Sequence, residues 1–139
     1  MIVLDTNIVL DLFVFADPAT QPLRAQLESG ALRWIATAPM RDELERVLAY
    51  PQIVRRLQQH PHPHPHQNSA QEVLARFDAL VQQQSVAAKA SVTCKDPDDQ
   101  KFIDLAVAHR ATLLSKDNAV LCMRKRLLAL GVLAQAAIN

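Results

Sequence analysis

Short runs of hydrophobic residues alternate along the chain with longer segments in which hydrophobic positions recur every three or four residues. The short runs cover residues 2–4, 32–36 and 112–115, and the first of them shows no polar alternation. Runs of this kind are typical of strands that are buried on both faces of a parallel sheet. We therefore predict strands at these three places.

The longer segments predict helices that end at helix-stopping residues. The predicted helices cover about 6–15, 21–29, 37–50, 51–59, 69–84, 97–110 and 118–130, with Gly30 and Gly131 after the second and the last. Further short strands are predicted within 85–93 and at 132–133, followed by a frayed Ala-rich tail. Strands that alternate with helices of this length indicate an α/β fold with a parallel sheet covered on both faces.

His and Pro alternate from residue 60 to residue 66. Such a sequence favours extended polyproline geometry and excludes a helix or a central strand. We predict an exposed loop inside a single domain that spans residues 1–139, because a chain of 139 residues suits one hydrophobic core. The alternative for His60, His62, His64 and His66 is that their imidazoles chelate a transition metal.

The formal net charge of +1 gives the chain no overall attraction to nucleic acid, so binding to a polyanion requires a local basic patch. Arg41, Arg46 and Lys116 are the candidate RNA contacts. The alternative is that these three basic side chains lie on solvated helix faces and contact no RNA. The chain has only 2 glycines, which excludes a GxGxxG motif or a Walker loop and, with them, the usual nucleotide-binding enzymes.

Cys94 and Cys122 are the only cysteines and form no CxxC motif, which favours a reducing, cytoplasmic compartment. No basic leader precedes a long apolar stretch, and no run reaches about 18 apolar residues. We therefore expect neither secretion nor a membrane-spanning segment.

Four acidic residues occur at predicted strand ends or in the first turns of predicted helices: Asp5, Glu43, Asp99 and Asp117. Ligands bind beyond the carboxyl ends of the strands in parallel α/β sheets, and several carboxylates meeting there suit a hard divalent cation. Each position also has a plainer interpretation. Asp5 and Asp117 can cap helices, one or more acids of the segment 96–99 can do the same, and Glu43 can pair with Arg41 or Arg46.

The acidic residues lie within four ordered segments of distinctive sequence. These are Val3-Leu4-Asp5-Thr6-Asn7, then Asp42-Glu43-Leu44, then Asp96-Pro97-Asp98-Asp99 followed by Phe102 and Ala106, and finally Leu114-Ser115-Lys116-Asp117. In this order the chain resembles PIN-domain endoribonucleases, and most closely the toxin components of toxin–antitoxin systems.

The resemblance implies a Rossmann-like, three-layer α/β/α fold with a mainly parallel sheet, and Mg²⁺- or Mn²⁺-dependent cleavage of RNA. The family's acidic quartet falls on Asp5, Glu43, Asp99 and Asp117. The first, third and fourth would bind the metal, and Glu43 would hold a metal-bound water or join the ligand set. Asp99 is preferred to Asp98 because its spacing to Ala106 matches the family. The supporting residues are Thr6, Asn7, Ser115 and Asp98.

The resemblance also implies partners, namely an RNA substrate and an antitoxin protein. The strongly apolar segment 10–15 is explained mostly by core burial, and we expect the rest of it to contact a second copy of the chain in a homodimer or an antitoxin helix. Two other functions remain open at this point. One is a non-catalytic module that binds RNA or protein, and the other is a metal-dependent DNA nuclease or phosphatase.

Overall fold

Five parallel strands form one sheet in the computed structural model, which describes residues 1–59 and 69–138. The strands are β1 (Ile2–Leu4), β2 (Trp34–Ala36), β3 (Val81–Gln83), β4 (Thr112–Leu114) and β5 (Ala134–Gln135), in the spatial order β3-β2-β1-β4-β5. The predicted three-layer α/β fold with a parallel sheet is therefore confirmed. The His-Pro segment, with its predicted loop and its four histidines, lies outside the described residues.

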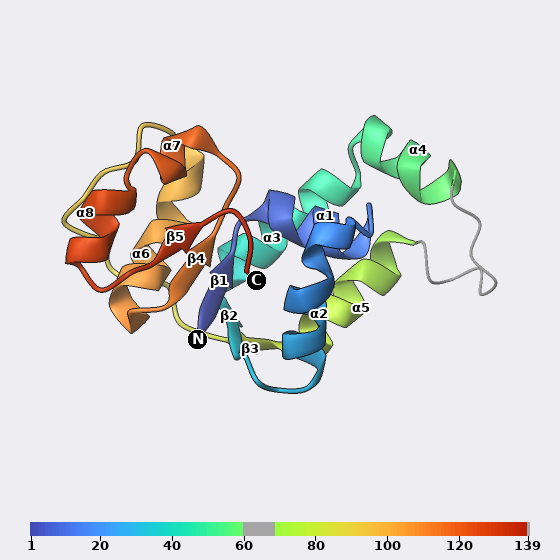
Figure 1. Cartoon of the computed structure of the whole chain (residues 1–139). Helices are drawn as coiled ribbons and strands as arrows, with labels where there is room; N and C mark the ends of the chain where they lie inside the picture. The colour runs from blue at the N-terminus through green and yellow to red at the C-terminus, as the bar shows by residue number, and fades with distance from the viewer. Residues whose placement is uncertain (60–68, 139) are drawn as a thin grey trace.

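Eight α-helices and two 3₁₀-helices connect the strands in the described ranges. They are α1 (Thr6–Phe13), η1 (Pro18–Thr20), α2 (Gln21–Glu28), α3 (Ala38–Leu48), α4 (Pro51–Gln59), α5 (Ala70–Leu80), η2 (Pro97–Asp99), α6 (Gln100–His109), α7 (Asn118–Leu121) and α8 (Arg124–Ala129). In Figure 1, α6, α7 and α8 gather on one side of the sheet, and α1, α2 and α5 lie on the other.

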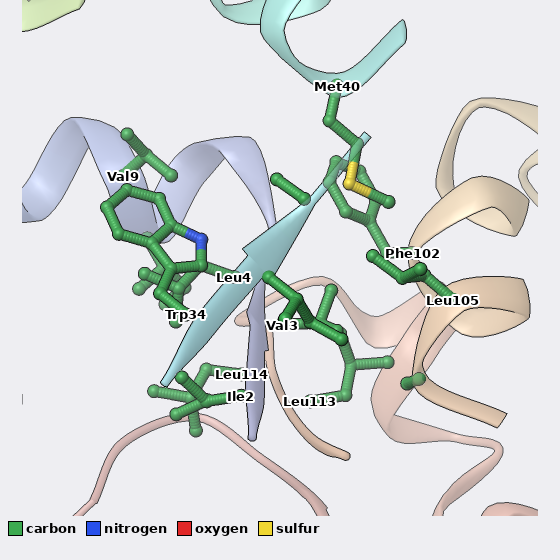
Figure 2. Close-up of a cluster of buried hydrophobic side chains, with 14 of the residues drawn as sticks. Ile2, Val3, Leu4, Val9, Trp34, Met40, Phe102, Leu105, Leu113 and Leu114 are labelled. Atoms are coloured by element: carbon green, nitrogen blue, oxygen red, sulfur yellow. The ribbon is translucent and has the colours of Figure 1, made fainter. Parts of the chain in front are cut away.

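The core lies on both faces of the central strand β1, whose three residues are all buried. Because successive side chains of a strand point to opposite faces, Val3 and Leu4 enter different layers. Figure 2 shows Val3 toward Phe102 of α6, whereas Leu4 lies toward Trp34. The Trp34 indole packs edge-on against Phe77 of α5, with ring centroids 5.1 Å apart. This two-sided burial explains why β1 reads as an uninterrupted apolar run.

The predicted helix over 69–84 is wrong at its C-terminal end. The helix α5 ends at Leu80, and Val81 adopts extended backbone angles that open strand β3. Gln82 and Gln83 then pair with Ile35 and Ala36 of β2, so the strand predicted within 85–93 is absent from that fully described stretch. The polar composition concealed β3, since an edge strand does not need two apolar faces.

The C-terminal predictions need two corrections. The helix predicted over 118–130 is two helices, α7 and α8, because Met123 leaves the helical region (φ −94°, ψ 5°) and is buried between them. The last strand is Ala134–Gln135 rather than 132–133, and it pairs with Leu113 and Leu114. Part of the Ala-rich end is therefore the edge of the sheet instead of a frayed tail.

Core burial accounts for most of the apolar segment 10–15. Leu10, Leu12 and Phe13 are buried, whereas Phe15 is 37% exposed. The guanidinium of Arg56 in α4 lies over the exposed Phe15 ring, 5.5 Å from its centroid. Only the end of this segment is thus available to another molecule.

Candidate metal centre

Three carboxylates from distant parts of the chain meet at the carboxyl edge of the sheet. Asp5 directly follows β1, Asp117 lies three residues after β4, and Asp99 ends η2 at the start of α6. Each offers one oxygen, and these oxygens all lie within 4.8 Å of one another. We call Asp5, Asp99 and Asp117 the acidic cluster. The structure thus brings together the three residues that were predicted as metal ligands.

Ser115 links the first and last members of the acidic cluster. The Ser115 hydroxyl donates to Asp5 Oδ2 at 2.7 Å, and its oxygen accepts the Asp117 backbone N–H at 3.0 Å. Strands β1 and β4 pair Leu4 with Leu114, so the next residues, Asp5 and Ser115, are neighbours across the sheet edge. Ser115 is fully buried, which fixes both contacts.

Asp117 both caps a helix and belongs to the cluster. Its Oδ1 accepts the backbone N–H of Ala119 at 3.0 Å at the start of α7. The capping role that was weighed against function is therefore real. A carboxylate has two oxygens, however, so capping by one leaves the other able to bind a cation.

In the acidic segment 96–99, one residue caps a helix and another joins the acidic cluster. Asp96 accepts the backbone N–H of Asp98 at 2.9 Å and so caps η2, while Asp98 is exposed. Asp99 is buried, and its Oδ2 has no hydrogen-bond partner among the described residues. Asp99 therefore enters the cluster, whereas the supporting residue Asp98 faces solvent.

Burial and mutual repulsion raise the pKa of two acids of the cluster. Desolvation is the main cause that raises the pKa of Asp99 from 3.8 to about 8, followed by a hydrogen bond to Asp117 and the charges of Asp5 and Asp117. Desolvation also raises the pKa of Asp5, although the Ser115 hydrogen bond opposes it. Two neighbouring carboxylates can share a hydrogen bond only when one of them keeps a proton. A cation at the same place would replace that proton.

Glu43 lies beside the acidic cluster and is held there by two contacts. Lys101 Nζ in α6 donates to Glu43 Oε1 at 2.8 Å, and the Thr6 hydroxyl donates to Glu43 Oε2. The charge of Glu43 contributes to the raised pKa of Asp5, so the two carboxylates repel each other electrostatically. Glu43 does form an ion pair, as the plainer interpretation of the sequence held, but its partner is Lys101 instead of Arg41 or Arg46.

The predicted basic contacts and polar supports have different surroundings. Arg41 donates two hydrogen bonds to Asp78, at 2.8 and 2.9 Å, and Lys116 pairs with Asp11. Arg46 is exposed and has no ion-pair partner in the described ranges. Asn7 is also exposed. Sequence reasoning missed Lys101, and the one available signal was its position in the first turn of the helix that begins after Asp99.

The acidic cluster fits a hard divalent cation. All its donors are carboxylate oxygens, which Mg²⁺ and Mn²⁺ prefer to nitrogen or sulfur ligands. Asp99 Oδ2 is buried without a donor, and a buried polar atom in this state is costly unless a proton or a cation binds it. The raised pKa values of Asp5 and Asp99 point the same way, because a bound cation would relieve the repulsion that causes part of them.

A parallel α/β sheet with an acidic cluster at its carboxyl edge places the chain in the class of α/β proteins with a candidate site for a divalent metal. Within this class, the model of the PIN domain family matches residues 1–119, and the chain belongs to that family. PIN domains are generally metal-dependent nucleases that bind nucleic acid. No curated protein matches the chain. Among residues 1–59 and 69–138, no helix is long and apolar enough to cross a lipid bilayer.

Proposed function

We propose that this chain is a Mg²⁺- or Mn²⁺-dependent endoribonuclease that hydrolyses RNA phosphodiester bonds as one domain. The observation that carries the proposal is the acidic cluster, in which Asp5, Asp99 and Asp117 offer oxygens within 4.8 Å and one buried oxygen lacks a donor. Membership of a nuclease family supports phosphodiester hydrolysis as the chemistry.

The residues of the site divide into ligands and groups that orient them. Asp5, Asp99 and Asp117 would hold the ion, and Ser115 would keep the Asp5 carboxylate turned toward them through its hydrogen bond. When bound, such an ion supplies a Lewis acid that activates water for attack and stabilises charge on the phosphate.

Glu43 would orient the attacking water. Its two oxygens are fixed from opposite sides of the site, by Lys101 of α6 and by Thr6 of α1. A carboxylate that is held in this way loses little conformational freedom when the substrate arrives, so it can act as a positioned acceptor for a water proton. With no covalent intermediate, the chain's own residues need only bind, orient and accept a proton.

Arg46 is the candidate phosphate contact that the described surroundings favour most. Arg41 and Lys116 are already paired with Asp78 and Asp11, so either would have to share its charge with an acidic neighbour. Arg46 is exposed without such a partner in the described part of the chain, on the same helix as Glu43. A phosphate of RNA passing over α3 would meet this guanidinium.

We further propose that the nuclease acts as the toxin of a toxin–antitoxin pair in the cytoplasm, and that it forms a homodimer. The ordered resemblance of its four acidic segments to such toxins supports the first part. Cys94 and Cys122 are free, which suits a reducing compartment. The exposed Phe15 ring, two residues after α1, is an apolar group that a partner helix or a second copy would cover.

The test is a substrate panel with the purified protein. We expect Mn²⁺ to raise the melting temperature and to support cleavage of single-stranded RNA, and we expect EDTA to abolish both effects. A DNA strand of the same sequence and a chromogenic phosphate monoester are the controls. Cleavage of the DNA strand or of the monoester alone would instead identify a DNA nuclease or a phosphatase. No cleavage and no thermal shift would identify a non-catalytic binding module.

A further inference from the structure

A cavity lined by Thr37, the residue after β2, and by Gln83, the last residue of β3, reaches the same edge of the sheet as the acidic cluster. It has a volume of about 340 Å³, within the range of small-molecule sites. Its polar lining is Thr37, Arg41, Asp78 and Gln83, and Phe77 and Val81 contribute apolar surface. We call it the Thr37 cavity. None of the groups proposed to bind the metal lines it.

Strand register places the Thr37 cavity one strand away from Asp5. Ile2 of β1 pairs with Trp34 of β2, and counting three residues along each parallel strand makes Asp5 the neighbour of Thr37. Adjacent strands lie about 4.8 Å apart, so Thr37, which lines the cavity, lies within a nucleotide's length of Asp5. A strand of RNA with its phosphate at the cluster would therefore carry a base to this cavity.

The lining supplies polar groups that are not bonded to other protein side chains. Thr37 is 4% exposed and occupies the N-cap position of α3, yet its hydroxyl makes no hydrogen bond in the part of the chain that the structure describes. The free hydroxyl and the Gln83 amide, at the end of β3, are thus both able to bond a ligand that enters the cavity.

The chemistry of the cavity suits a nucleobase better than a phosphate. The Asp78 carboxylate accepts two hydrogen bonds from Arg41 and neutralises it, so the cavity offers a phosphate no net positive charge. A base offers apolar faces to Phe77 and Val81, and its edge carries both donors and acceptors for hydroxyl and amide groups. Bases of single-stranded RNA are exposed for contacts of this kind.

We propose that the Thr37 cavity binds the base of a nucleotide that adjoins the scissile phosphate of single-stranded RNA. The inference rests on the proposed function, because it takes the position of that phosphate from the acidic cluster. Thr37 and Gln83 contact the edge of the base, and the neutral Arg41–Asp78 pair forms a polar wall with no net positive charge for a phosphate. The cavity thereby makes cleavage depend on base identity.

The experiment measures binding without cleavage, by fluorescence anisotropy of the Asp5→Asn protein in EDTA. The probes are fluorescein-labelled single-stranded RNAs of uridine, adenosine or cytidine, and an abasic RNA of equal length. Gln83→Leu and Thr37→Val should each weaken binding of at least one base-bearing probe about fivefold, the effect of one lost hydrogen bond, and leave the abasic probe unchanged. Gln82→Leu is the matched control, because Gln82 is the preceding residue of β3 and does not line the cavity.

The outcomes separate the cavity from the nuclease. If Gln83→Leu and Thr37→Val bind every base-bearing probe as tightly as Gln82→Leu does, the cavity does not bind a base. The proposal is also overturned if the two substitutions weaken binding of the abasic probe equally. It is overturned as well if the parent Asp5→Asn protein binds none of the base-bearing probes. A base-dependent loss in a protein whose wild type cleaves no RNA would keep the cavity and reject the nuclease.

Discussion

Two groups of carboxylates in this protein have opposite surroundings. In the acidic cluster, Asp99 is buried beside Asp5 and Asp117, and its pKa is raised to about 8. The second group, which we call the rim acids, consists of Asp78 and Asp11. Asp78 pairs with Arg41, whose hydrogen bond lowers the pKa of Asp78, and Asp11 pairs with Lys116. The rim acids already have cations from the protein, whereas the cluster acids face one another.

The difference distinguishes acids that form ion pairs within the protein from acids that we propose to bind a metal ion. An exposed ion pair such as Arg41–Asp78 contributes about 0 to 1 kcal/mol, so this pair is a minor contribution to stability. Buried like charges are unfavourable, and a fold keeps them only if a proton or a cation compensates. The same residue type therefore has a structural role at the rim and a proposed chemical role in the cluster.

The largest expected effect comes from removing a cluster charge. Asp5→Asn should lower the rate of RNA cleavage by more than about a hundredfold. Loss of a residue that only hydrogen-bonds to a metal ligand costs up to about a hundredfold, and loss of the ligand itself should cost more. The metal-free variant should be as stable as the wild type or more stable, because one repelling charge is gone. Asp11→Asn is the matched control at the rim and should change the cleavage rate less than about threefold. Equal effects of the two substitutions would remove the distinction between the groups.

The next effect is a pH dependence of the metal-free protein. Asp99 has a folded pKa of about 8 against an ordinary value of 3.8, so the folded state binds more protons between these values. The contribution of Asp99 is therefore fully present below about pH 4 and is lost as the pH rises toward and through 8. We expect the melting temperature in EDTA to fall from pH 5 to pH 8. Asp99→Asn should flatten this slope, and Asp78→Asn should not.

A smaller effect on the cleavage rate should show whether Glu43 acts with the acidic cluster or only forms an ion pair, as the rim acids do. Lys101→Met removes the cation that holds Glu43 and should lower the cleavage rate about tenfold, the usual cost of losing a group that orients a site. Lys95→Met, at an exposed lysine outside the site, is the control. A cleavage rate that increases in Lys101→Met would mean that Lys101 competes with the metal instead of positioning Glu43.

Part of this architecture could be predicted from local sequence. The apolar run of β1 followed by Asp5 fixes a carboxylate at the carboxyl edge of the sheet, and the run of β4 does the same for Asp117. The caps of η2 and α7 were also predictable, since Asp is favoured at these positions. These features depend on neighbours within a few residues, which the sequence displays directly.

Other features depend on contacts that no local pattern encodes. Strand β3 was hidden at the end of a helical pattern, because Gln82 and Gln83 become a strand only by pairing with β2. The choice of Lys101 as the partner of Glu43, 58 residues away, depends on how α3 and α6 cross. Sequence proximity favoured Arg41 instead, and that arginine turns to Asp78 on α5.

By itself the sequence determined the α/β fold class, the strand ends that carry Asp5 and Asp117, and a resemblance that singled out Asp99. Only the tertiary structure decided that these carboxylates meet, that Glu43 and Arg41 take different partners, and that Thr37 lines a cavity. The physical reason is that periodicity and capping are properties of neighbouring residues. Desolvation and the pairing of charges are set by side chains that only folding brings together.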